Sequence, residues 1–402
     1  MLENSKSSFI IAFSLLIMAI GLFYFPVVMI MFLFAINSYV FSKYKIYPLL
    51  ISISILIFIF QYTLNLNGIE VGDIARYYEL LNNGYNNSFL RFNLYQAYFF
   101  QYIEDNNLMQ NIYGAISVSA TFLIYSFTSV RFLKLFGYCI TTRIDWLLFL
   151  FLLVSLIPFT VFYSFANALS FAFIYLFIYF YIKSRYVGAI LSSTLALLIH
   201  NASTVPFLIY FFSKFKFILK HKFLSLIITT SLVSFVLSFT NSIASMDIPY
   251  ISMIFKKVIS YLVINNEVSL VNTIYNILNL AFFSYIYIHH ERNIKFKNKK
   301  FILYHNFIFS YILVCIPFVL SSTIGGRYLQ LGVMFFLPYI YACFKSYKLN
   351  SKKVIALYVF LFISLFSYSN LYFISSLRHL SFGDEELLIY SLKDIFYYEV
   401  NQ

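Results

Sequence analysis

SFANALSFAFIYLFIYFYI, residues 164–182, contains no charged side chain. An α-helix of roughly 20 mainly apolar residues crosses a hydrocarbon core about 30 Å thick, so this stretch predicts a membrane-spanning helix. The whole chain agrees, because 61% of its 402 residues are hydrophobic, 22% are aromatic and its mean hydropathy is +0.82. One soluble core could not bury so much apolar surface. The sequence therefore predicts an all-α, polytopic integral membrane protein.

Apolar runs of similar length recur between polar breaks. They predict about thirteen transmembrane helices, with a range of about 11 to 14, in one polytopic domain over 1–402. The first run follows Lys6 and is not followed by a small-residue cleavage site, so we expect a retained anchor and not a signal peptide. The predicted spans are 8–24, 25–42, 46–64, 108–130, 146–162, 164–182, 186–201, 202–213, 223–240, 270–288, 301–320, 328–344 and 354–374.

Lys and Arg residues are spread unevenly over the predicted loops. Because basic loops resist translocation, their distribution sets the orientation. A cytoplasmic N-terminus places most of the 28 basic residues inside, so we predict that orientation. The formal net charge of +13 then reflects topology, not nucleic-acid binding, and the basic inner face suits anionic membrane lipids. The basic residues left outside are Arg76, Arg91, Lys256, Lys257, Arg327, Arg378 and Lys393.

Four segments are predicted to face outward. The loop 65–107 is the longest, and the apolar residues of its second half have the near-helical spacing of an interfacial helix lying on the outer leaflet. A second external loop covers 241–269, and an external tail covers 375–402. Between them, SSTIGGRYLQ at 321–330 forms a short outward crossing.

The loop after the third predicted helix gathers charge in a chain with only 11% charged residues. Glu70, Asp73 and Arg76 follow at intervals of three, so a helical turn would place them on one face. A carboxylate here could act as a general base or bind sugar hydroxyls, and an Arg beside Tyr77 could clamp a phosphate. The alternative is a solvated loop ordered by an exposed ion pair, which is worth roughly 0 to 1 kcal/mol.

Two further outward residues carry candidate chemistry. Arg327 follows Gly325 and Gly326, which would let the backbone turn tightly and expose its N–H groups, while the guanidinium offers bidentate geometry for a phosphate. The alternative for Arg327 is snorkelling from a helix end. His200 in ALLIHNAS could hydrogen-bond a phosphate or move a proton, or it could simply be satisfied by Asn201 or by the backbone.

No cofactor or metal site is predicted. The three cysteines are isolated, which indicates neither a disulfide framework nor a thiolate site. His289, His290 and Glu291 are adjacent and would point in different directions on a helix. Since they also fall on the predicted cytoplasmic side, we interpret them as surface charge.

Four short motifs together resemble the EpsG/Wzy group of polysaccharide polymerases. They are G-x-x-x-G-D-x-x-x-Y-Y at 68–78, the helix PFTVFYSFANALSFAFIYLFIYFYIKSRY at 158–186, LLIHNAS at 197–203 and GGRYLQLG at 325–332. The resemblance covers most of the chain in order. It implies an enzyme that joins oligosaccharide repeats linked to undecaprenyl pyrophosphate into O antigen or a similar polysaccharide, at the outer face of the bacterial inner membrane. It also implies a partner protein that regulates chain length.

The resemblance assigns the acidic residue to Asp73, the aromatic residue to Tyr77, the histidine to His200 and the late basic residue to Arg327. One position departs from the pattern. Where relatives often have Arg-Gln, this chain has Ala166 and Asn167, so a basic contact is missing, and we expect Arg76 or Arg91 to replace it. The candidate catalytic residues are Asp73, His200 and Arg327, and the candidate substrate-binding residues are Glu70, Arg76, Tyr77, Arg91, Asn167 and Tyr328.

Other membrane functions stay open at this point. An O-antigen ligase uses the same donor, and sequence alone barely separates it from a polymerase. A flippase for lipid-linked sugars should carry polar or basic residues inside several helices. The apolar runs contain few such residues, among them Asn167 and Asn279. A membrane acyltransferase would need a His deep in the bilayer, whereas His200 is predicted at the outer end of its helix.

Overall fold

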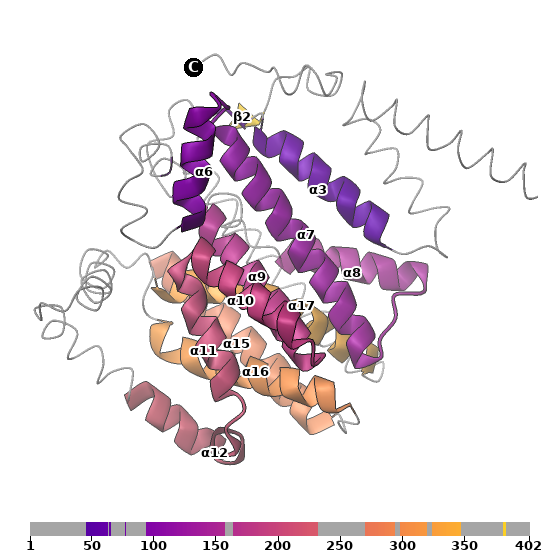
Figure 1. Ribbon diagram of the computed structural model, residues 1–402. Helices are drawn as coiled ribbons and strands as arrows, with labels where there is room; N and C mark the ends of the chain where they lie inside the picture. The colour runs from indigo at the N-terminus through magenta and orange to yellow at the C-terminus, as the bar shows by residue number, and fades with distance from the viewer. Residues whose placement is uncertain are drawn as a thin grey trace, which may run out of the picture.

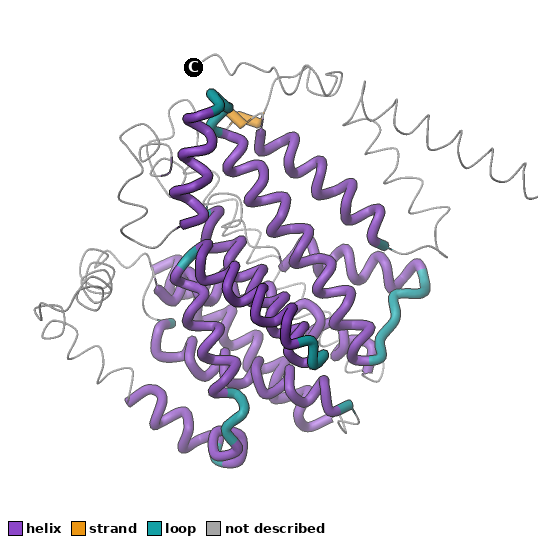
Figure 2. Tube along the Cα trace, viewed as in Figure 1, coloured by secondary structure: helices purple, strands orange, loops and turns teal. Residues whose placement is uncertain are grey.

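The computed structural model describes residues 46–62, 64–65, 77, 94–156, 164–231, 270–293, 298–319, 324–346 and 381–382 (Figures 1 and 2). These residues are helical or lie in the turns that join helices, apart from one short antiparallel pair. In that pair, β1 (Leu64–Asn65) lies beside β2 (Ser381–Phe382). The prediction of an all-α architecture is confirmed for this part of the chain.

Apart from α6 and α12, the α-helices overlap the predicted apolar runs. Their bounds are α3 (Tyr47–Tyr62), α6 (Leu94–Asp105), α7 (Asn111–Phe136), α8 (Arg143–Leu156), α9 (Phe165–Ile182), α10 (Tyr186–Ile199), η2 (Asn201–Ser203), α11 (Thr204–Phe212), α12 (Lys216–Lys220), α15 (Leu270–Asn293), α16 (Lys299–Cys315), η3 (Ile316–Phe318) and α17 (Ile324–Ser346). A further apolar helix covers Lys222–Ser231.

Within the described residues, four helices are long and apolar enough to cross a membrane. They cover Asn111–Phe136, Phe165–Ile182, Lys299–Phe318 and Tyr328–Ser346. These match the predicted spans 108–130, 164–182, 301–320 and 328–344, which supports the assignment to the membrane. The predicted spans 8–24, 25–42 and 354–374 lie outside the described residues. The total of about thirteen and the orientation of the N-terminus stay predictions.

Buried aromatic rings from four helices form the centre of the bundle. Phe132 of α7 lies with its ring centroid 4.6 Å from Tyr304 of α16 and 5.1 Å from Tyr175 of α9. Phe335 of α17 lies 5.7 Å from Tyr175. Because lipid tails are as apolar as these side chains, close packing and hydrogen bonding, not the hydrophobic effect, hold such helices together in a membrane. α9 is therefore enclosed by the helices around it.

Gly332 of α17 lets that helix approach α16 closely. A Cβ atom at this position would lie 2.2 Å from the Tyr311 hydroxyl oxygen and 2.4 Å from Cε1 of the same ring. The ring cannot swing away cheaply, because its hydroxyl donates a hydrogen bond to the carbonyl oxygen of Tyr328 at 2.6 Å. GGRYLQLG therefore ends in a glycine whose lack of a side chain is required by packing.

We expect Gly332→Ala to lower the free energy of unfolding by about 1 to 3 kcal/mol, since overpacking forces side chains out of their rotamers. Thermal unfolding of the purified protein in detergent measures the change. Adding Tyr311→Leu opens the space and should recover part of the loss. If Gly332→Ala alone unfolds at the wild-type temperature, then α16 and α17 do not pack this closely.

Polar contacts join the helices at the end of the bundle where α17 finishes. Lys345 forms an ion pair with Asp145, at the start of α8. On α15, Glu291 forms an ion pair with Lys222. The sequence analysis assigned Lys222, Glu291 and Lys345 to the cytoplasmic side, and the structure places both pairs where helices begin or end. The two ion pairs therefore agree with the prediction that these loops lie on the same side of the membrane.

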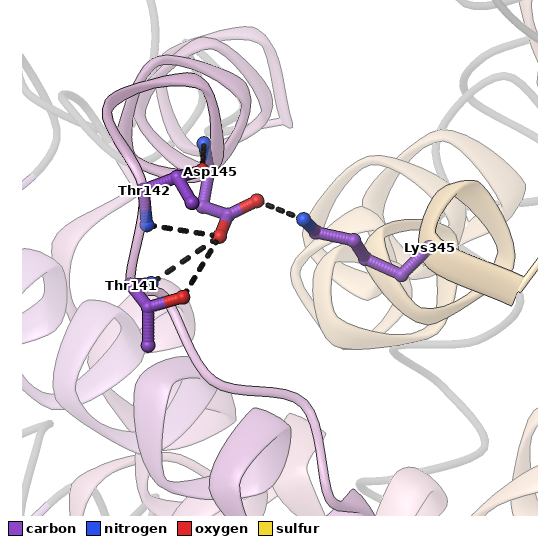
Figure 3. Close-up of polar contacts among 4 residues, drawn as sticks. All are labelled: Thr141, Thr142, Asp145 and Lys345. Carbon is purple, nitrogen blue, oxygen red and sulfur yellow. Dashed lines mark hydrogen bonds and ion pairs between the residues drawn. The ribbon is translucent and has the colours of Figure 1, made fainter.

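Asp145 receives hydrogen bonds from several directions (Figure 3). One carboxylate oxygen pairs with Lys345, while the other accepts from the N–H of Thr142 at 3.1 Å and from the N–H of Thr141 at 3.3 Å. Burial alone would raise the pKa of Asp145. The hydrogen bonds from Lys345 and from the threonines outweigh that effect and lower the pKa from 3.8 to about 2.

This pKa shift makes the free energy of unfolding depend on pH in the acid range. Because the folded pKa of Asp145 is depressed, its contribution is fully present above about pH 4 and is lost as pH falls towards 2. We expect a loss of about 2 kcal/mol in the free energy of unfolding over that range. Unfolding in detergent at pH 5, 4, 3 and 2 measures it. Asp145→Asn should flatten this part of the profile, and an unchanged profile in the variant would assign the acid sensitivity to other carboxylates.

His290 corrects one interpretation made from the sequence. Its side chain is fully buried, its Nδ1 lies 3.0 Å from Sγ of Cys343, and its ring lies 4.9 Å from that of Tyr339. The interpretation as surface charge is therefore wrong for His290. Adjacent residues on a helix do point in different directions, and for this reason Glu291 is exposed while His290 faces α17.

Candidate functional site

Three chain segments meet where α9 begins, α10 ends and α17 begins. The hydroxyl group of Tyr328 in α17 donates to the carbonyl oxygen of Ala202 in η2, at 3.4 Å. The ring of Tyr328 lies 5.9 Å from the ring of Phe171 in α9. The motifs LLIHNAS and GGRYLQLG, far apart in the sequence, are therefore in contact, and α9 lies beside them.

His200 forms the corner between α10 and η2. Its backbone is extended, with φ −161° and ψ 134°, so α10 stops there. Its Nδ1 accepts a hydrogen bond from the N–H of Ala202 at 3.0 Å, and its carbonyl oxygen accepts one from the Ser203 hydroxyl at 2.8 Å. An accepting Nδ1 leaves the proton of a neutral imidazole on Nε2. The half-buried ring is thus held as a donor at Nε2.

Asn167 lies in the first turn of α9, with its side chain 2% exposed. Its Nδ2 donates to the hydroxyl of Ser164 at 2.8 Å. Its Oδ1 has no hydrogen-bond partner among the described residues. A buried carbonyl oxygen of this kind costs free energy unless a donor reaches it, so Asn167 has one acceptor to offer to a bound molecule.

Tyr77 is buried against the beginning of α9. Its ring stacks on Phe165 with centroids 5.6 Å apart and meets the ring of Tyr113 in α7 edge-on at the same distance. Tyr77 therefore brings part of the predicted loop 65–107 to the start of α9. That is the same helix end that carries Asn167.

Arg327 lies in the first turn of α17, directly before Tyr328. Gly325 and Gly326 were expected to form a tight turn. Instead α17 begins at Ile324, so both glycines are inside its first turn. The expected exposure of backbone N–H groups still follows, because the first four N–H groups of any helix lack partners within the helix. The side chain of Arg327 lies outside what the structure describes.

The other predicted charges are not placed. Glu70, Asp73, Arg76 and Arg91 lie outside the described residues. The structure therefore brings together four of the nine candidate residues through their side chains or neighbours, namely Tyr77, Asn167, His200 and Tyr328. The loop predicted to hold an interfacial helix does contain α6, and a location at the outer leaflet stays a prediction.

The electrostatics of this corner favour an anion. α9 and α17 begin here, and the N-terminus of a helix carries a partial positive charge of roughly half a proton charge. Unpaired N–H groups and this partial charge make helix N-termini suited to phosphate groups. The donor at His200 Nε2 adds to this set, and the hydroxyl of Tyr328 offers a polar atom beside it.

Tyr311 was missed by sequence reasoning. Its hydrogen bond to the carbonyl oxygen of Tyr328 fixes the beginning of α17, and so it positions Tyr328 against η2. The signal available in the sequence was Gly332, since a glycine inside an apolar helix indicates close approach by a neighbouring helix. Only the structure identifies which side chain approaches.

Among the described residues, no group of three or more His, Cys, Asp and Glu side chains could hold a metal ion. No family model, curated protein or solved structure matches the chain. The function must therefore be argued from the site itself. The site offers neutral hydrogen-bonding groups and helix N-termini at one end of an apolar bundle.

Proposed function

We propose that this protein is a polysaccharide polymerase of the bacterial inner membrane. It joins oligosaccharide repeats carried on undecaprenyl pyrophosphate into O antigen or a similar surface polysaccharide. In this proposal the chain has about thirteen transmembrane helices and a cytoplasmic N-terminus, so the site faces the outer side of the membrane. A chain-length regulator is the expected protein partner.

One observation carries the proposal most directly. The hydrogen bond from Tyr328 to Ala202 joins the two motifs that the resemblance to EpsG/Wzy polymerases marked as functional. A substrate with a lipid tail, a diphosphate and sugars needs an apolar surface, an anion site and hydroxyl-binding groups. The exposed apolar face of α10, the helix N-termini and the acceptor at Asn167 suit these three parts.

The proposed reaction is a glycosyl transfer. A hydroxyl oxygen of the acceptor sugar attacks the anomeric carbon of the donor, and a new C–O bond forms. The bond between that carbon and the diphosphate oxygen breaks, so undecaprenyl pyrophosphate leaves as an anion. Asp73 accepts the proton of the attacking hydroxyl. Arg327, His200 and the helix N-termini stabilise the charge on the leaving diphosphate.

Deletion of the gene followed by a gel of extracted lipopolysaccharide or capsule tests the proposal. A lost polymerase leaves a single repeat on each acceptor, and complementation should restore the ladder of longer chains. A complete absence of repeats would instead indicate an O-antigen ligase or a flippase. An unchanged ladder would contradict any role in assembling this polysaccharide.

A further inference from the structure

α15 directs two asparagines into the helix bundle. Asn276 is 0% exposed and Asn279 is 1% exposed. They share a face with Phe283 and His290, at the spacings of three, four and seven residues that place side chains on one side of a helix. Residues on the other side of α15, such as Ile277, are exposed. Both asparagines therefore belong to the buried stripe of α15.

The stripe faces α17. Phe283 stacks on Phe336 of α17 with ring centroids 3.8 Å apart, and further along both helices His290 meets Cys343, so α15 and α17 run parallel. Asn279 lies four residues before Phe283, and Gly332 lies four residues before Phe336. Because the two helices run parallel, Asn279 lies at the level of Gly332. By the same register, Asn276 lies at the level of the turn that follows Tyr328.

The buried side-chain amides of Asn276 and Asn279 contain polar atoms without a hydrogen-bond partner among the described residues. Both side-chain polar atoms of Asn276 and Nδ2 of Asn279 are buried without a hydrogen-bond partner in the part of the chain that the structure describes. The hydroxyl oxygen of Ser310, on the neighbouring α16, shares this condition. Polar groups inside a membrane bundle are expensive and mark the paths of substrates.

The chemistry of an amide selects the ligand. Without carrying charge, Asn276 offers two N–H donors and one carbonyl acceptor, and Asn279 offers the N–H donors of its Nδ2. Sugar hydroxyl groups both donate and accept, so they match this set. A diphosphate only accepts and would face the carbonyl oxygen of Asn276 unfavourably, while an isoprenoid chain offers no hydrogen bond.

The geometry points to a sugar-binding subsite formed by Asn276 and Asn279, which receives hydroxyl groups of the lipid-linked oligosaccharide. This inference rests on the proposed function and adds residues that no motif marked. In this arrangement charged groups bind the diphosphate, and neutral amides bind the sugar.

The double variant Asn276→Leu with Asn279→Leu tests the subsite. Two probes are compared in detergent by equilibrium binding: the lipid-linked repeat that accumulates in cells lacking the gene, and undecaprenyl pyrophosphate without sugar. We expect the variant to bind the glycosylated lipid at least about 10-fold more weakly, and to bind the bare lipid as the wild type does. Tyr341→Phe is the control, because it removes a different buried polar group, a hydroxyl without a partner among the described residues, towards the opposite end of α17.

The outcomes separate the two proposals. Suppose that the wild type binds the glycosylated lipid more tightly than the bare lipid, and that the double variant shows the same preference. The subsite is then wrong and the proposed function stands. An equal loss for both lipids also overturns the subsite. If the wild type does not prefer the glycosylated lipid, both proposals fail. Should the double variant not accumulate in the membrane, Asn279→Leu alone carries the same comparison.

Discussion

Asp73→Asn should stop chain growth after a single repeat. Asparagine keeps the size of the side chain and most of its hydrogen bonds, but it cannot take a proton from the acceptor hydroxyl. General-base catalysis contributes about 10²- to 10⁴-fold to a rate, and a loss of that size removes the ladder of long chains. Turnover of purified lipid-linked repeats in detergent measures the rate, and a parallel binding assay should show that substrate still binds.

Glu70→Gln is the matched control for Asp73→Asn. If Glu70 only positions a sugar or Arg76, its variant should lose much less activity. The double variant should then be little slower than Asp73→Asn alone, since groups that act in one step are not additive. Turnover by Asp73→Asn near the wild-type rate would remove the general base from the mechanism, and the loop 65–107 would then be a lid or a solvated tether.

Arg327→Ala should reduce polymerisation by at least about 100-fold at normal protein level. Loss of one group that stabilises charge in a transition state typically costs 10²- to 10³-fold in rate. Arg327 lies in the first turn of α17, beside the residue that contacts η2, so its charge adds to that of the helix N-terminus. Arg327→Lys should keep part of the activity, because an ammonium keeps the charge but loses the planar fork.

A release assay distinguishes this role from general damage. If Arg327 stabilises the leaving diphosphate, undecaprenyl pyrophosphate should appear more slowly in Arg327→Ala while the unfolding temperature stays close to that of the wild type. Full activity in the alanine variant would mean that Arg327 only snorkels to the headgroups. Equal damage in the lysine and alanine variants would indicate that the fork, not the charge, matters.

The apolar runs predicted the long helices well. The span 164–182 agrees with α9 at Phe165–Ile182, and its C-terminal end was predictable because Lys183 follows the charge-free run directly. The run 186–201 was predicted slightly too long, since the extended backbone of His200 ends α10 at Ile199. The local sequence was therefore enough to predict that these helices form. The end of α10 depended on the backbone conformation of one residue, His200.

Contacts between helices could not be predicted in this way. Nothing in either motif shows that Tyr328 reaches Ala202, or that Tyr311 fills the space beside Gly332. The burial of His290 was missed for the same reason, because it depends on which face of α15 meets α17. Hydropathy indicates that a residue is apolar or polar, but only tertiary packing determines the neighbours of a side chain.

The length of α10 has a consequence for the surrounding bilayer. Its 14 residues extend about 21 Å, whereas the hydrocarbon layer is about 30 Å thick. If Lys183 and Arg185 lie among the inner headgroups, as the proposed topology has it, the corner at His200 ends about 9 Å short of the outer hydrocarbon boundary. Hydrophobic mismatch of this kind thins the surrounding membrane. The outer leaflet would then dip towards the corner, so that a lipid-borne diphosphate reaches the N-termini of α9 and α17 without leaving its own monolayer.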